Sequence, residues 1–134
     1  MKMLINIDVP DLDAALAFYQ AALGLTHSRT IDDDVAELSG ASCLVYLLEK
    51  APGTATDPTA ARSRQYSRHW TPVHIDFVVD NIEAAAQRAL LAGARQESGF
   101  VDWMGSTCAS FSDPFGNGFC LIRFSGETYD ATAG

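Results

Sequence analysis

Two segments of the chain alternate between apolar and polar residues, as half-buried strands do. The first runs from Leu4 to Val9 and the second from His74 to Val79. Each places three large apolar side chains on one strand face: Ile5, Ile7 and Val9 in the first, Ile75, Phe77 and Val79 in the second. The opposite face of each strand is mixed, so the pattern predicts sheets that take a helix on one side and form a pocket on the other.

A helical pattern follows each of these strands. Asp11 and Asn81 are suited to cap the first turns, because their side-chain oxygens can accept from free backbone N–H groups. Gly24 and Gly93 follow the last apolar residue of each pattern and predict the helix ends. Both predicted helices are rich in alanine, which lets helix and sheet approach closely.

The two halves form an internal repeat, since residues 4–16 can be laid over residues 74–86 without a gap. After each helix the pattern turns to short strands. They are predicted at 25–31, 35–38 and 43–48 in the first half, and at 95–101, 106–112 and 119–124 in the second. Each half is therefore predicted to be a βαβββ module, and the fold class to be α+β.

A chain of 134 residues fits one domain. We expect its parts to be a first module at about 1–49, a linker at about 50–71, a second module at about 72–125 and a tail at 126–134. The linker is rich in Pro, Thr, Ala and Arg and shows no strand period. A connection of this length is often functional or mobile.

The amino-acid composition and net charge limit the classes of partner that the protein can bind. The net charge of −8 argues against nucleic acid as a partner, because that affinity comes mostly from Lys and Arg. No apolar run approaches the ~20 residues that cross a bilayer, and the N-terminus does not resemble a secretory signal, so we expect a cytoplasmic protein with no membrane partner. The acidity also suits a cationic small molecule. Cys43 and Cys108 are predicted to be buried, reduced thiols.

Two stretches of sequence resemble a known family. Val9-Pro-Asp-Leu-Asp-Ala-Ala-Leu-Ala-Phe-Tyr19 with Leu23-Gly24-Leu25, and Asp113-Pro-Phe-Gly-Asn117 with Phe119-Cys-Leu121, are similar to the vicinal oxygen chelate superfamily. That superfamily holds glyoxalases, extradiol dioxygenases and bleomycin-resistance proteins. The resemblance implies paired modules whose sheets curl around a funnel. It also implies a homodimer, with each pocket built from two modules.

The resemblance also implies where a metal would bind. Metal-dependent members place ligands on the first and last strands of each module, which here are Leu4, Tyr46, His74 and Cys120. Leu has no donor atom, Tyr rarely ligates, and the family often has Glu where this chain has Cys120. Divalent ions of this kind favour imidazole and carboxylate. We therefore expect no metal and no other cofactor.

Several residues are candidates for binding or chemistry. His74 and Asp76 share a strand face and are candidates for acid–base catalysis, although His74 can equally be a hydrogen-bonded residue of the pocket wall. Cys120 is either a nucleophile or a small wall residue. The expected ligand-binding residues are Tyr46, His74, Trp70, Trp103 and Cys120.

Three hypotheses follow. The first is a metal-free binding protein that holds an aromatic or antibiotic-like molecule in a dimeric pocket, as bleomycin-resistance-like members do. The second is a metal-dependent lyase, isomerase or dioxygenase with a divergent site that includes His74. The third is a metal-free enzyme that uses His74 and Asp76 as acid and base. Fold analogy alone does not choose among them.

Overall fold

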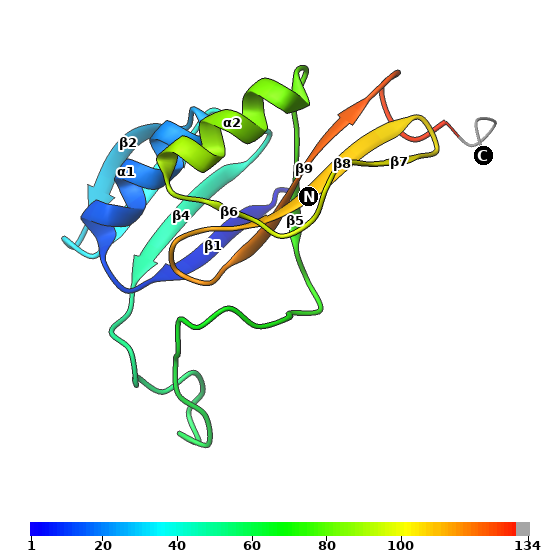
Figure 1. The fold of residues 1–134 in the computed structure, drawn as a ribbon. Helices are drawn as coiled ribbons and strands as arrows, with labels where there is room; N and C mark the ends of the chain where they lie inside the picture. The colour runs from blue at the N-terminus through cyan, green and yellow to red at the C-terminus, as the bar shows by residue number, and fades with distance from the viewer. Residues whose placement is uncertain (131–134) are drawn as a thin grey trace. The chain divides into compact units, whose positions relative to one another are not determined.

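The chain is seen in a computed structural model that describes residues 1–130. It divides into two units, Met1–Ser67 and Arg68–Gly134, each with its own sheet and helix. Figure 1 labels most of the elements of both units. Neither helix in the described part of the chain is long and apolar enough to span a membrane.

The first unit has the predicted βαβββ order. Its elements are β1 (Leu4–Val9), α1 (Leu12–Leu23), β2 (Thr26–Ile31), β3 (Val35–Ser39) and β4 (Leu44–Glu49). The strands lie in the order β1-β4-β3-β2, with β1 parallel to β4 and the other pairs antiparallel. A parallel pairing of β1 with β4 requires the long crossover that α1 and the hairpin strands provide.

The helix α1 begins and ends where the sequence predicts. The Asp11 side chain accepts from the Ala14 N–H at 3.0 Å, and Gly24 adopts the left-handed conformation with φ of 67°. The buried side of the helix contacts β4, β2 and β3. That side is formed by Leu12, Ala15, Phe18, Tyr19 and Ala22.

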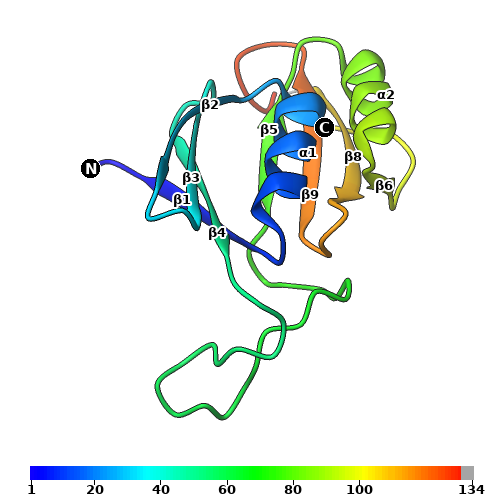
Figure 2. The same ribbon diagram turned by 90° about the vertical axis from the view of Figure 1, so that its left-hand side faces the viewer.

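The second unit repeats this plan. Its elements are β5 (Ile75–Val78), α2 (Ile82–Ala92), β6 (Arg95–Gln96), β7 (Val101–Trp103), β8 (Ser106–Ser112) and β9 (Gly118–Phe124). The strand order is β5-β9-β8-β6, and β7 also pairs with β8. Figure 2 shows α2 along one side of β8 and β9.

The continuous strand predicted at 95–101 is wrong. It is two short pieces, β6 and β7, on the same edge of β8, separated by a bulge at 97–100. The N–H groups of Glu97 and Ser98 both point to the Ser110 carbonyl, at 2.8 and 3.4 Å. The Ser98 hydroxyl then accepts from the Ser110 N–H at 2.9 Å. The Ser98 side chain thus replaces one of the backbone hydrogen bonds between the strands. The spacing of apolar residues does not reveal such a replacement.

The turn between β8 and β9 is organised by Asp113, which is buried. Its Oδ1 accepts from the Phe115 and Asn117 N–H groups, both at 2.8 Å. Its Oδ2 accepts from the Asn117 side chain at 3.0 Å. Gly116 has a positive φ of 87°. This turn sets the register in which β8 and β9 pair.

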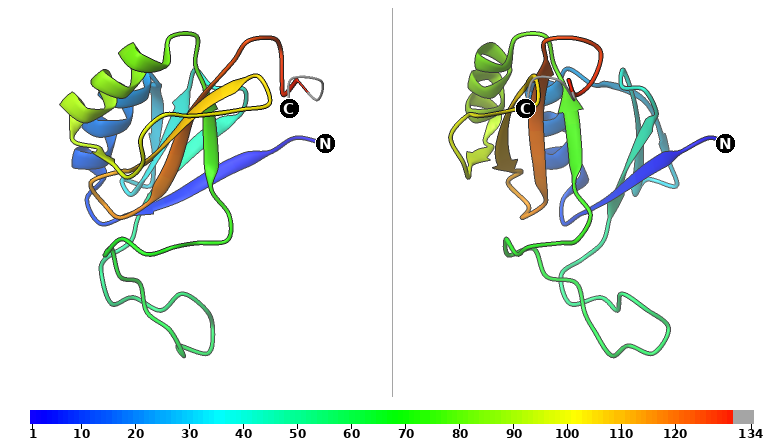
Figure 3. Two further views of the ribbon diagram at one scale, coloured as in Figure 1. Left: turned by 45° about the vertical axis from the view of Figure 1, so that its right-hand side comes forward. Right: turned by 90° about the vertical axis from the view of Figure 1, so that its right-hand side faces the viewer.

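The face of the second sheet opposite α2 is called the open face below. Residues directly opposite each other on paired strands point to the same side of a sheet. The rows across the open face are therefore Asp76, Cys120 and Ser110; Val78, Ile122, Cys108 and Val101; and Phe124, Ser106 and Trp103. Figure 3 shows α2 lying to one side of these strands.

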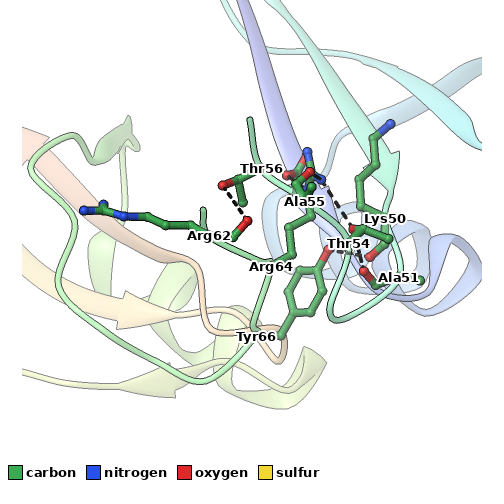
Figure 4. A network of polar contacts seen from close by, with 9 residues as sticks. Lys50, Ala51, Thr54, Ala55, Thr56, Arg62, Arg64 and Tyr66 are labelled. Atoms are coloured by element: carbon green, nitrogen blue, oxygen red, sulfur yellow. Dashed lines mark hydrogen bonds and ion pairs between the residues drawn. The ribbon is translucent and has the colours of Figure 1, made fainter. Parts of the chain in front are cut away.

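The segment that follows β4 in the first unit is held by polar contacts (Figure 4). Arg64 forms an ion pair with Asp8 of β1 at 2.8 Å and donates to the Ala55 carbonyl at 2.5 Å. The Tyr66 hydroxyl donates to the Lys50 carbonyl at 2.6 Å. The expected linker of 50–71 therefore has a fixed local structure over residues 50–66, although it contains no long strand.

Candidate functional site

Three side chains with different donor atoms meet at one end of the open face. They are His74, Asp76 and Cys120, and their ligand atoms all lie within 4.8 Å of one another. The pairing of β5 with β9 places Asp76 beside Cys120. His74 lies just before β5, and its Nδ1 is 3.1 Å from Asp76 Oδ1.

The His74–Asp76 contact orients the imidazole ring. An ionised carboxylate only accepts hydrogen bonds, so the Nδ1–H group donates to Asp76 Oδ1. In the neutral ring, Nε2 is then the nitrogen that can accept a proton in acid–base chemistry. The side chains are 57% and 32% exposed, so a small molecule can reach both groups.

The thiols of the open face are held in their neutral form. Burial raises the pKa of Cys120, and the negative charge of Asp76 acts in the same direction. Burial and the neighbouring Cys120 raise the pKa of Cys108 to about 11. Because the thiolate is the reactive species, these shifts argue against Cys120 as a nucleophile. Its Sγ lies 3.5 Å from the Ser110 hydroxyl, which makes it a weakly polar wall residue.

Three apolar side chains of the open face are accessible. Val78, Val101 and Trp103 are each more than half exposed. Ile122 lies between them and is buried. A polar cluster at one end of an exposed apolar surface is the usual composition of a ligand-binding site.

The equivalent positions in the first unit carry different chemistry. Asn6 pairs with Tyr46 as Asp76 pairs with Cys120, so Leu4 is the equivalent of His74. Leu4 is exposed but has no donor atom.

Tyr46 is engaged by a buried carboxylate on the neighbouring strand. Its hydroxyl donates to Glu37 Oε2 at 2.7 Å, and Arg29 donates to the same oxygen through Nε and Nη2 at 3.2 and 3.1 Å. The Ser28 hydroxyl donates to Glu37 Oε1 at 3.1 Å. Hydrogen bonds from Tyr46 and Arg29 hold the pKa of Glu37 below its usual value. The Glu37 carboxylate therefore accepts its hydrogen bonds from side chains of the protein itself.

The structure brings together some of the predicted site residues and separates others. His74, Asp76 and Cys120 form one cluster, and Trp103 lies on the same face. Trp70 precedes β5 and is 79% exposed. Tyr46 belongs to the Glu37 cluster of the first unit.

Sequence reasoning missed Glu37, together with its partner Arg29, and it missed the closeness of Cys108 to Cys120. Glu37 could have been found from the sequence, because it is a charged residue within a predicted strand and its side chain points to the same face as Tyr46. The closeness of the two thiols could not have been found, because it depends on the register of β8 against β9.

The donors of the second unit fit a divalent metal in part. An imidazole, a carboxylate and a thiol are the donor types that zinc accepts. The family resemblance implies one metal ligand on the first strand and one on the last strand of each module. The first unit lacks both, because Leu4 cannot ligate and the Tyr46 hydroxyl is hydrogen-bonded to Glu37. The second unit instead offers three donors of its own, with Asp76 as the third.

Several solved structures share this fold. A hypothetical protein from S. aureus has a TM-score of 0.72 at 22% identity, with 92% of this chain and 93% of that chain covered. The fosfomycin resistance protein FosX from Listeria monocytogenes has a TM-score of 0.71 at 16% identity, with 95% of each chain covered. A lactoylglutathione lyase from Agrobacterium tumefaciens has a TM-score of 0.64 at 20% identity, with 92% of each covered.

No curated protein matches the sequence. The sequence pattern of the glyoxalase-like domain matches residues 4–122, which include every strand and helix of both modules except the last two residues of β9. The fold of paired βαβββ modules agrees with that match. The chain therefore belongs to the glyoxalase-like domain family.

Proposed function

We propose that the chain is a metal-free small-molecule-binding protein that holds an aromatic, cationic ligand on the open face. The observation that carries the proposal is the Asp76 carboxylate, oriented by His74 at 3.1 Å and set beside exposed apolar side chains. We further propose that the protein works in the cytoplasm as a homodimer.

The charges of the cluster favour a cation. An ionised carboxylate has about four lone-pair sites, so Asp76 can accept from a ligand ammonium while it accepts from His74. Cys120 remains a neutral thiol because its pKa is raised, and it adds no competing charge. The net charge of −8 attracts cations over a longer range. A hydrogen bond to a charged group is worth roughly 1.5–3 kcal/mol, which is about a tenfold to hundredfold effect on affinity.

Calorimetric titration with a panel of planar organic cations tests the proposal. We expect saturable binding to protein treated with chelator, and a loss of at least about tenfold in affinity for Asp76→Asn. Asp13→Asn removes the same charge from an exposed position on α1 and is the matched control. Equal affinities for both variants would show that the open face is not the binding site.

A second candidate function is metal-dependent catalysis, favoured by the three donor atoms within 4.8 Å. His74, Asp76 and Cys120 would hold the ion, which would supply a Lewis acid at the open face. The same preparation distinguishes the candidates by elemental analysis before chelation. A stoichiometric ion that His74→Ala and Cys120→Ala both lose, and Cys43→Ala retains, would replace the metal-free proposal with this one.

A further inference from the structure

The end of the open face far from His74 carries three aromatic rings, two of which contact the third. Tyr129 makes edge-to-face contacts with Trp103, at 5.3 Å between ring centroids, and with Phe124, at 4.9 Å. Trp103 is 63% exposed and Tyr129 is 44% exposed. The cluster, called the aromatic corner below, therefore presents ring surface to solvent.

The strand register fixes the position of the aromatic corner relative to the polar cluster. Phe124 and Cys120 lie on the same strand and the same face, four residues apart. At about 3.3 Å per residue, this separates the two ends of the face by about 13 Å. The row between them contains the exposed Val78 and Val101, so the surface that joins the two ends is apolar.

The aromatic corner is held in place by backbone contacts. The Asp130 N–H donates to the Met104 carbonyl at 2.7 Å, and the Ser125 N–H donates to the Gly105 carbonyl at 2.8 Å. Gly105 has a φ of 74°, and a Cβ there would lie 2.9 Å from the Asp130 Cβ. The segment that carries Tyr129 is thus fastened against the turn between β7 and β8.

A cavity of about 620 Å³ adjoins the aromatic corner, and its lining includes Trp103, Ser106 and Phe124. This volume falls within the range of about 300–1,000 Å³ that small-molecule sites occupy. Its lining also includes Asp102, Thr107 and Arg123, which the register places on the opposite face of the sheet, so the cavity follows the end of the strands and borders the open face only in part.

We infer that the aromatic corner is a second subsite, which binds a planar ring at the far end of the same ligand. The inference rests on the proposed function and specifies its ligand class: an elongated amine with a terminal aromatic ring. The ammonium binds Asp76, the spacer crosses Val78 and Val101, and the ring packs against Trp103. Ring contacts of this kind contribute beyond the apolar area that they bury.

The test compares two series of primary amines by calorimetry on the full chain. One series has a terminal phenyl or naphthyl ring on alkyl spacers of increasing length, and the other has the same alkyl chains without a ring. We expect the ring to raise affinity about tenfold, and only at spacer lengths that reach across about 13 Å. Amines with shorter spacers should bind no better than their ring-free counterparts.

Variants separate the two ends of the face. Trp103→Ala and Tyr129→Ala should each remove the gain in affinity that the ring provides, and Trp103→Phe should retain part of that gain. None of the three variants should lower the affinity for the ring-free amines. Leu91→Ala, which truncates an exposed side chain on α2, is the control for lost apolar surface. Folding of each variant is checked by its thermal transition, and Trp103→Phe keeps the test valid if Trp103→Ala does not fold.

The outcomes are distinguishable. If ring-free amines bind through Asp76 but the ring adds nothing at any spacer length, the aromatic subsite is wrong and the proposed function stands. The same conclusion follows if the ring-dependent gain survives both alanine variants. If no amine binds the wild-type protein, both proposals are overturned.

Discussion

At the residue scale, Glu37 and Asp76 show how the same type of side chain is used in two ways. Glu37 is 8% exposed and receives hydrogen bonds from Tyr46, Arg29 and Ser28. Asp76 is one-third exposed and receives a hydrogen bond from His74. A carboxylate whose partners all belong to the protein stabilises the fold, whereas an accessible one can receive a ligand.

The stability contributed by Glu37 should depend on pH. Its pKa is lowered in the folded protein, so the folded state binds fewer protons than the unfolded state near the ordinary glutamate pKa of about 4.3. The stabilisation is therefore complete above that value and is lost as the pH falls through the lower, folded pKa. We expect wild-type protein to lose more unfolding free energy between pH 6 and pH 3 than Glu37→Gln does, as measured by urea denaturation.

Glu127→Gln provides the control for that experiment, because Glu127 is exposed. Its pH dependence should follow the wild type. If Glu37→Gln also follows the wild type, the bonds from Tyr46 and Arg29 do not lower the pKa of Glu37 in solution.

At the element scale, the turn of the β2–β3 hairpin has a backbone conformation that residues other than glycine rarely adopt. Asp32 and Asp33 have positive φ values of 50° and 64°, and the Asp34 N–H donates to the Ile31 carbonyl at 3.3 Å. Two successive positive φ angles characterise a type I′ turn, which favours Asn-Gly and Asp-Gly. The three adjacent carboxylates also repel one another.

Asp33→Gly should therefore stabilise the protein by about 0.5–1 kcal/mol, because glycine adopts a positive φ without a Cβ clash. Thermal denaturation at neutral pH measures the change. Asp34→Gly removes the same charge at a position without a positive φ, so it serves as the control and should stabilise less. Equal gains from both variants would assign the effect to charge repulsion alone.

The same local reasoning explains which elements were predictable from the sequence. Helix ends at Asp11, Gly24, Asn81 and Gly93 are set by neighbouring residues, and all four were predicted correctly. The break at 97–100 depends on Ser98 bonding to Ser110 twelve residues away, and the strand there was predicted wrongly. The aromatic corner likewise joins Trp103 to Tyr129, which no periodicity connects.

At the scale of the whole molecule, the two modules keep one topology and differ in what they offer to a ligand. Both pair their first strand in parallel with their last. The candidate site was predictable to the extent that it follows this repeat, which put His74 and Cys120 on terminal strands. Asp76 was predicted as the partner of His74 on the same strand face, but its closeness to Cys120 and the hydrogen bond of Tyr46 to Glu37 became evident only from side-chain geometry.

Exposed apolar residues at the edge of the first sheet give the last prediction, which concerns assembly. Met3 and Leu4 are 67% and 59% exposed, and Leu4 belongs to β1, an edge strand whose free side can bind another chain. We expect sedimentation equilibrium to give twice the chain mass of 14.4 kDa. Leu4→Asp should shift the protein toward monomer, because a charge buried at the interface without a partner is costly. Leu91→Asp, on the exposed side of α2, should leave the mass unchanged. A wild-type chain that stays monomeric at high micromolar concentration contradicts the homodimer.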